Sequence, residues 1–168
     1  STDGAGFFKS LKNFKVKGST ITVIGAGGAA RSIIAEAAVQ GAGQITVYNR
    51  TYKPELFADY PGNIVFKPLS DLTELIGDLL VNTTSLGMDG VSLPIPMDLQ
   101  LPKDMLVADV IYQPIETPLL TYAKSQGNPT VNGLGMLLYQ AAESFKLWTG
   151  QEMPTDMILK KLEEKIYG

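Results

Sequence analysis

One short glycine-rich segment limits the folds open to this chain more than any other feature. Gly25-x-Gly27-x-x-Ala30 directly follows the β-branched run 20–24 and directly precedes an Ala- and Ile-rich segment, 29–40, that has helical spacing. Gly25 permits a tight turn, Gly27 permits close approach of a pyrophosphate, and Ala30 permits a helix to pack closely on a sheet. A glycine-rich connection without a ligand is the alternative, but the strand–turn–helix context favours dinucleotide binding through the backbone of Gly25, Ala26, Gly27, Gly28 and Ala29.

The rest of the chain alternates short apolar runs with helical segments, which is typical of a parallel sheet covered on both faces. Strands are expected at 20–24, 44–49, 64–66, 79–82, 105–111 and 130–131. Helices are expected at 4–12 with Asp3 as N-cap, at 29–40, after Thr51 as N-cap, and at 71–76, 117–126, 135–149 and 155–166. The predicted fold is a doubly wound, Rossmann-type α/β domain with strand order 3-2-1-4-5-6. Its 168 residues suit a single domain, 1–168.

Composition excludes several kinds of chemistry. The chain has no cysteine and no histidine, so thiolate nucleophiles, disulfides and imidazole bases are absent. Proton transfer would need a carboxylate, a lysine, a tyrosine or water. The formal net charge of −3 gives no support for nucleic-acid binding, and no apolar run is long enough to span a bilayer. A cytoplasmic protein, without metal, membrane or nucleic-acid partners, is expected.

The end of the second predicted strand bears on which dinucleotide would bind. NAD-binding domains usually place Asp or Glu there to bond the ribose 2′-hydroxyl. This chain has Asn49, Arg50 and Thr51, with Lys53 close behind. A guanidinium pairs with a 2′-phosphate that a carboxylate would repel, so the segment favours NADP. Arg50 as a solvated charge and Thr51 as a simple helix cap are the alternatives.

Six segments along nearly the whole chain form a recognisable set of motifs: Thr2-Asp3-Gly4-Ala5-Gly6-Phe7, 25–30, 49–51, 82–88, Asp109-Val110-Ile111-Tyr112-x-Pro114-x-x-Thr117-Pro118 and Asn132-Gly133-x-Gly135-Met136-Leu137-x-x-Gln140. Together these segments resemble the shikimate dehydrogenase family, specifically its cofactor domain. The resemblance implies reduction of 3-dehydroshikimate to shikimate by hydride transfer from NADPH, in aromatic amino-acid biosynthesis. Two alternatives stay open: a quinate/shikimate dehydrogenase that uses NAD, and a stand-alone nucleotide-binding module without catalysis.

The resemblance also implies a catalytic role for Asp3, which works in this family with a lysine of an N-terminal substrate domain. None of the lysines that follow Asp3 is placed to replace that residue, and Ser1 stands where the family usually has Asn. We therefore expect the chain to lack the substrate domain, to bind NADP and to turn over negligibly. Residues 1–17 would form the interdomain region, and the helices of 135–168 would pack toward the missing domain. A homodimer is left open.

Further site residues follow from the same resemblance, each with a structural alternative. Tyr112 and Gln140 match positions that contact shikimate; the alternatives are a packed tyrosine and a glutamine bonded to backbone. The other candidates lie toward the ribose and nicotinamide and are Thr83, Thr84, Ser85, Val110, Gly133 and Met136. Ordinary turn bonding is the alternative for the three hydroxyls, and core packing is the alternative for Met136.

Overall fold

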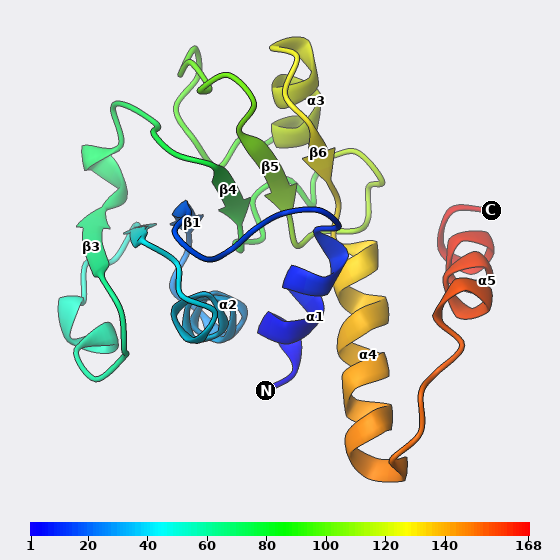
Figure 1. Cartoon of the computed structure of the whole chain (residues 1–168). Coiled ribbons are helices and arrows are strands. Elements are labelled where there is room, and N and C mark those ends of the chain that lie inside the picture. Colours follow the sequence, from blue (N-terminus) through cyan, green and yellow to red (C-terminus); the bar gives the residue numbers. More distant parts are fainter.

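A six-stranded parallel sheet forms the centre of the computed structural model, which describes residues 1–168 (Figure 1). The sheet has the order β3-β2-β1-β4-β5-β6, which confirms the predicted 3-2-1-4-5-6 arrangement. The strands are β1 (Thr20–Ile24), β2 (Gln44–Asn49), β3 (Ile64–Pro68), β4 (Leu79–Asn82), β5 (Leu106–Asp109) and β6 (Thr130–Val131). The strand order reverses between β1 and β4, and ligands bind at such switch points in doubly wound sheets.

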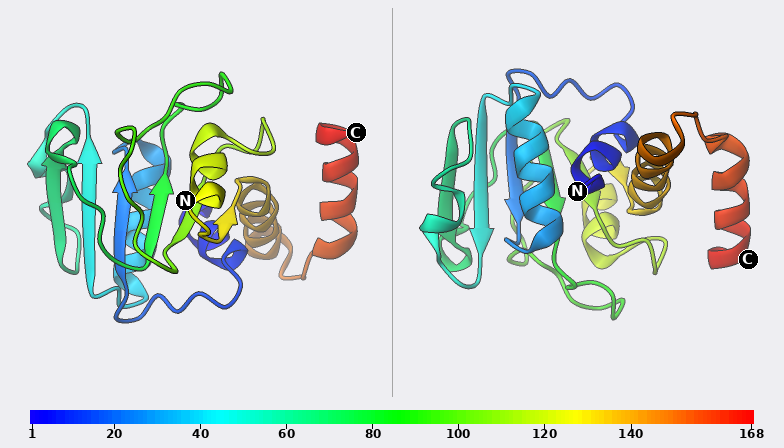
Figure 2. Two further views of the ribbon diagram at one scale, coloured as in Figure 1. Left: turned by 90° about the horizontal axis from the view of Figure 1, so that it is seen from above. Right: turned by 90° about the horizontal axis from the view of Figure 1, so that it is seen from below.

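The two faces of the sheet are covered differently. The helices are α1 (Asp3–Ser10), α2 (Gly28–Val39), α3 (Pro118–Ser125), α4 (Leu134–Thr149) and α5 (Thr155–Tyr167), with 3₁₀ turns η1 (Pro54–Phe57) and η2 (Leu69–Asp71). Figures 1 and 2 show α1, α2 and α4 on one side of the sheet, and α3 with long loops on the other. Each face has its own apolar core, one including Val23 and Ile33 and the other including Leu80 and Leu119. The central strands are therefore buried on both sides, as parallel strands usually are.

Glycines let α1 fit tightly between α2 and α4. A Cβ on Gly4 would lie 2.3 Å from the carbonyl oxygen of Ser32, and one on Gly6 would lie 2.4 Å from the backbone nitrogen of Gln140. Since both neighbours are backbone atoms, no larger residue fits without moving a helix. This close packing fixes the position of Asp3, at the start of α1, relative to Gln140.

Three local predictions were wrong. Thr51 does not cap a helix, because only the short turn η1 forms and its N-cap is Lys53; Pro54 disfavours helical backbone in the residue before it, and Lys53 has φ −134°. No helix spans 71–76, because Leu72 and Leu75 instead pack from an extended segment into the core beneath α3. Asp3 is the first residue of α1 rather than its N-cap, which is Thr2.

The last helix, α5, stands apart from the sheet (Figure 2). It has no buried residue, and Met157 is 54% exposed. Its end is tied down by Tyr167, whose hydroxyl donates a hydrogen bond to the carbonyl oxygen of Tyr112 and accepts one from Asn132 Nδ2 at 3.2 Å. None of the helices has the length and apolar character needed to cross a membrane.

Candidate functional site

A groove made of two hollows runs along the carboxyl ends of the central strands. The β2 hollow, of about 280 Å³, is lined by Ile24, Gly25, Tyr48, Asn49, Arg50, Leu69, Thr84, Ser85 and Leu86. The β5 hollow, of about 570 Å³, is lined by Thr83, Thr84, Ser85, Met88, Val110, Ile111, Tyr112 and Gln113. Thr84 and Ser85 line both, so the two hollows adjoin at the point where the strand order reverses. The structure thus brings predicted residues from four separate segments to one place.

The glycine turn separates β1 from α2 at the edge of this groove. Gly25 has φ +106°, which favours glycine, and a Cβ there would lie 2.3 Å from Thr83 Oγ1. Gly27 and Gly28 are exposed, and a Cβ on either would meet no protein atom within 4 Å. No side chain caps the start of α2. Its first N–H groups are therefore free to bond an anion, and the helix dipole favours negative charge there.

The end of β2 supplies the positive charge of the groove. Arg50 is exposed and forms neither an ion pair nor a hydrogen bond within the chain, so its guanidinium is free for a ligand. Asn49 Nδ2 donates to the carbonyl oxygen of Thr51 at 2.9 Å, which shapes the turn. Thr51 and Lys53 are exposed but do not line the β2 hollow.

The three hydroxyls after β4 differ in their availability. Thr83 Oγ1 donates to the carbonyl oxygen of Ile24 at 2.6 Å. Thr84 Oγ1 donates to Asn82 Oδ1 at 2.7 Å and accepts from the Leu86 amide at 3.1 Å. Ser85 is exposed and its hydroxyl has no partner in the chain. Turn bonding thus occupies the protons of Thr83 and Thr84, while Ser85 presents a free hydroxyl to both hollows.

Beneath this turn lies a buried polar cluster that the sequence analysis did not identify as a site. Asp109, at the end of β5, is 1% exposed, and Asn82 and Thr117 are fully buried. The Asp109 carboxylate accepts hydrogen bonds from Asn82 Nδ2, the Ile111 amide and Thr117 Oγ1. Burial raises the pKa of Asp109 to about 6, although the three hydrogen bonds act to lower it. The one signal available in the sequence was a carboxylate, Asp109, at the end of an apolar strand.

Of the residues proposed to lie near the nicotinamide, some line the groove and others belong to the core. Val110 lines the β5 hollow. Met136 is 8% exposed and belongs to the core on the α2 side of the sheet. Gly133 is needed for packing whatever binds nearby, since a Cβ there would lie 1.9 Å from the carbonyl oxygen of Val110.

The proposed substrate residues do not all meet in the groove. Tyr112 lines the β5 hollow and is 36% exposed. Gln140 instead lies at the contact between α4 and α1, where its Oε1 is 3.5 Å from Thr2 Oγ1. Asp3 is partly exposed beside Thr2, and its carboxylate forms no ion pair or hydrogen bond. Within this chain, Asp3 and Gln140 are therefore neighbours through Thr2, whereas Tyr112 belongs to the β5 hollow.

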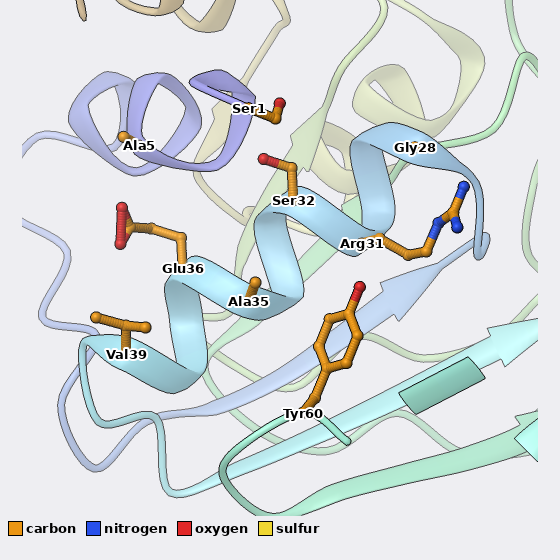
Figure 3. A pocket seen from close by; sticks show the side chains of 9 residues that line it. All are labelled: Ser1, Ala5, Gly28, Arg31, Ser32, Ala35, Glu36, Val39 and Tyr60. Atoms are coloured by element: carbon orange, nitrogen blue, oxygen red, sulfur yellow. The ribbon is translucent and has the colours of Figure 1, made fainter. Parts of the chain in front are cut away.

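A further hollow lies on the outer side of α2 (Figure 3). Arg31, Ser32 and Glu36 project into it from α2, and Tyr60 faces them from the loop after η1. Gly28 is the only predicted site residue in its lining. Arg31 Nε points back to the carbonyl oxygen of Gly27 at 3.4 Å. No group of three Asp or Glu side chains comes together here or elsewhere in the chain to hold a metal ion.

The groove lining also includes residues that sequence reasoning missed. Leu69, Leu86 and Ile111 supply apolar surface, and Gln113 a polar side chain. All four lie just beyond strand ends, which was the one signal that could have suggested them. The fold and this groove together define a Rossmann-type domain with a candidate ligand groove at its topological switch point.

Comparison with known proteins supports this class of domain and identifies the family within it. The family model described as "Shikimate / quinate 5-dehydrogenase" matches residues 9–90, and the one described as "Shikimate 5'-dehydrogenase C-terminal domain" matches residues 133–163. A curated "Shikimate dehydrogenase (NADP(+))" of Streptococcus pneumoniae (strain JJA) is 51% identical over 178 aligned positions, which cover 98% of this chain and 63% of that protein. The chain belongs to the shikimate/quinate 5-dehydrogenase family, and it spans 63% of the length of this relative.

Solved structures share the fold over nearly the whole chain. Shikimate 5-dehydrogenase of Thermus thermophilus, in complex with NADP(H) and shikimate, matches with a TM-score of 0.79 and 33% identity over 95% of this chain and 60% of that one. The ligand-free 5-ketofructose reductase of Gluconobacter sp. strain CHM43 matches with a TM-score of 0.90 and 35% identity over 98% and 63%. The same domain architecture therefore occurs in proteins named for different substrates.

Proposed function

We propose that this chain binds NADP in the groove, as the cofactor-binding part of an oxidoreductase that reduces 3-dehydroshikimate to shikimate. The observation that carries the cofactor assignment is Arg50, an unpaired guanidinium in the β2 hollow. That hollow adjoins the β5 hollow, which Tyr112 lines. The shikimate substrate is supported by the 51% identity to a protein of that name. NADP also appears in the name of that relative.

The residues of the groove fit a phosphorylated dinucleotide from one end to the other. The backbone of residues 25–29 would hold the pyrophosphate at the uncapped start of α2. Arg50 would pair with the 2′-phosphate, with Asn49, Thr51 and Lys53 beside it. Ser85 would bond the ribose, while Thr83 and Thr84 would mainly shape the turn. NADPH supplies a hydride when it is bound, and Val110, Gly133 and Met136 would border its nicotinamide ring.

The substrate side of the reaction rests on three residues. Tyr112 would contact the substrate at the mouth of the β5 hollow, and Gln140 from α4. Asp3 would hold or move the proton of the reacting oxygen, together with a lysine, because the chain has no histidine. Asp3 forms no ion pair in this chain, and Lys9 of the same helix pairs instead with Glu143. We therefore expect the 168-residue chain to bind the cofactor but to oxidise shikimate negligibly.

The arrangement of α1 and α4 supports a surface on which the substrate domain of such an enzyme would dock. Residues 1–17 would lie between the cofactor domain and a substrate domain, and the helices of 135–168 would face that domain. Leu147 and Trp148, near the end of α4, are 75% and 85% exposed. These apolar side chains are available for such a contact.

The proposal is tested by calorimetric titration of the chain with NADP and, separately, with NAD. We expect tighter binding of NADP. Replacing Arg50 with Ala should weaken NADP binding by about 10- to 100-fold, the value of a charge-assisted hydrogen bond, and leave NAD binding little changed. Equal loss for both dinucleotides would contradict the assignment of Arg50 to the 2′-phosphate.

A second variant tests the glycine turn without disturbing the fold. Gly27 has an extended backbone with a negative φ (φ −80°, ψ −163°), and a Cβ there would meet no protein atom within 4 Å. Gly27→Val should therefore melt within a few degrees of the natural chain while binding NADP at least about tenfold more weakly, because the side chain would occupy the space of the pyrophosphate. Undiminished binding would place the pyrophosphate elsewhere.

A further inference from the structure

The floor of the groove contains a buried polar cluster that the proposed function does not use. Asn82 ends β4 and Asp109 ends β5, and the two side chains meet at 3.1 Å between Asn82 Nδ2 and Asp109 Oδ1. Thr117, which caps α3, donates to Asp109 Oδ2 at 2.8 Å. All three residues are at most 1% exposed. A cluster so deeply buried tolerates no unpaired polar atom, and every buried side-chain nitrogen and oxygen of the chain has a hydrogen-bond partner.

This cluster joins the two turns that line the β5 hollow. On the β4 side, Asn82 Nδ2 donates to the carbonyl oxygen of Leu86 at 3.1 Å, and Asn82 Oδ1 accepts from the Thr84 amide at 3.0 Å. On the β5 side, Asp109 Oδ1 accepts from the Ile111 amide at 3.1 Å, directly before Tyr112. One carboxylate oxygen, Asp109 Oδ1, therefore receives a bond from Asn82 at the end of β4 and a bond from Ile111 in the turn after β5. It adds to the backbone bond from the Val110 N–H to the Asn82 carbonyl oxygen, at 3.1 Å, in holding the two turns together.

No positive charge compensates the Asp109 carboxylate. Neighbouring β4 and β6 carry no titratable residue. On α3, the Tyr122 hydroxyl donates to the carbonyl oxygen of Leu99, and Lys124 pairs with Glu116. The charge is held by hydrogen bonds alone, and burial without a counter-ion raises the pKa of Asp109 to about 6. The two protonation states of Asp109 are thus both accessible in ordinary buffers.

We propose that Asp109 is a positioning residue for the groove: its carboxylate holds the turn after β4 and the turn after β5 in one arrangement, and it holds them more firmly when charged. The cluster itself stands on the geometry above, and its effect on binding rests on the proposed function. A charged carboxylate accepts all three bonds. When protonated, it donates through one oxygen to Thr117 Oγ1, and the bonds from Asn82 and Ile111 to the other oxygen lose their charge assistance.

Asp109→Asn is a close imitation of the protonated state. Its amide oxygen can still accept from Asn82 and Ile111, and its amide nitrogen can donate to Thr117 Oγ1. The variant at any pH should therefore resemble the natural chain at low pH. Asp89→Asn is a matched control, because Asp89 is an exposed carboxylate in the loop after β4 that bonds only the nearby Val91 and Ser92.

The direct test follows backbone amide signals of the chain by nuclear magnetic resonance between about pH 5 and pH 8, with no ligand added. The amides of Thr84, Leu86 and Ile111 should titrate together with one midpoint near pH 6. That shared midpoint should persist in Asp89→Asn and vanish in Asp109→Asn. Separate midpoints on the two turns, no titration, or a shared midpoint that survives in Asp109→Asn would each overturn the proposal.

A second arm measures the effect on binding by NADPH fluorescence over the same pH range. The 2′-phosphate of the probe itself titrates near about pH 6, so the quantity compared is the ratio of dissociation constants of Asp109→Asn and the natural chain. This ratio should be near one at about pH 5 and rise to about fivefold at about pH 8, the equivalent of one hydrogen bond. A ratio that stays at one would overturn the positioning role in binding. Failure of the natural chain to bind NADPH would count against the proposed function, and the amide titration would still decide the role of Asp109.

Discussion

The two ends of the groove are built on opposite principles. At the β2 end, polar groups are exposed and have no partner in the chain. The Arg50 side chain forms no ion pair or hydrogen bond, and the backbone at Gly27 and Gly28 is exposed to solvent. Beneath the β5 end, by contrast, Asn82, Asp109 and Thr117 form a buried cluster whose polar side-chain atoms bond to one another. The sheet order β3-β2-β1-β4-β5-β6 places β2 and β5 on opposite sides of β1.

Because of this difference, we expect the residues that govern ligand binding and the residues that govern folding stability to lie at different ends of the groove. Groups that wait for a ligand contribute little to folding, so changes at the β2 end should alter affinity and selectivity first. Groups that satisfy one another in a low-dielectric interior contribute to the shape of the site and to the free energy of unfolding together. Changes at the β5 end should therefore alter stability first and binding only through shape.

The largest effect is expected from Gly133→Ala at the β5 end. The added Cβ would lie 1.9 Å from the carbonyl oxygen of Val110 and 3.0 Å from the carbonyl carbon of Ile111, and neither backbone atom can yield easily. We expect a loss of about 3 kcal/mol or more in the free energy of unfolding, measured by urea denaturation.

Gly127→Ala is the control for this substitution. Gly127 has φ +83°, but a Cβ there would meet no atom within 4 Å, so only backbone strain of about 1–2 kcal/mol applies. Equal losses in the two variants would mean that the close approach of Val110 to Gly133 does not constrain the β5 end.

Asp109 is expected to change the free energy of unfolding by a similar amount, but in a way that depends on pH. Its pKa is about 6 in the folded chain and about 3.9 in an unfolded one. Between these values the folded state binds more protons, so this group's contribution to stability falls as pH rises from about 4 to 6, by about 3 kcal/mol in all. The free energy of unfolding of the natural chain, measured against that of Asp109→Asn, should decline by this amount across the window. Parallel curves for the two proteins would show that Asp109 titrates normally.

The smallest effect is expected from Tyr167→Phe, which extends the comparison to α5. The variant loses the hydroxyl that bonds the Tyr112 carbonyl oxygen and Asn132, and a typical hydrogen bond contributes about 1 kcal/mol. Because α5 has no buried residue, its amides should exchange with solvent several-fold faster, while those of α2 stay unchanged. Tyr139→Phe removes a hydroxyl that has no hydrogen-bond partner in the chain and should change neither. Unaltered exchange in α5 of Tyr167→Phe would mean that other contacts hold the helix.

The β2 end could be predicted from sequence because its parts are local. Gly25, Gly27 and Ala30 stand in one turn, and Arg50 follows its strand directly. A strand position and a glycine spacing suffice to place these residues at the sheet edge. The prediction failed nearby only where a proline decided the backbone, as at Lys53 before Pro54.

The β5 end could not be predicted in the same way because its contacts join distant segments. Asp109 meets Asn82 and Thr117 only because β4 and β5 are adjacent in the sheet and α3 packs behind them. Likewise, the use of the Thr83 and Thr84 hydroxyls in turn bonding, and the attachment of Tyr167 to Tyr112, depend on atoms that no local pattern specifies.

The sequence by itself thus determined the strand order, the glycine turn and the charge at the end of β2, since hydrophobic periodicity and glycine position act over a few residues. Only the tertiary structure decided which polar groups remain free for a ligand and which form hydrogen bonds inside the domain. The physical reason is that a buried polar atom must find its partner in space, and the packing of the whole sheet decides what that partner is.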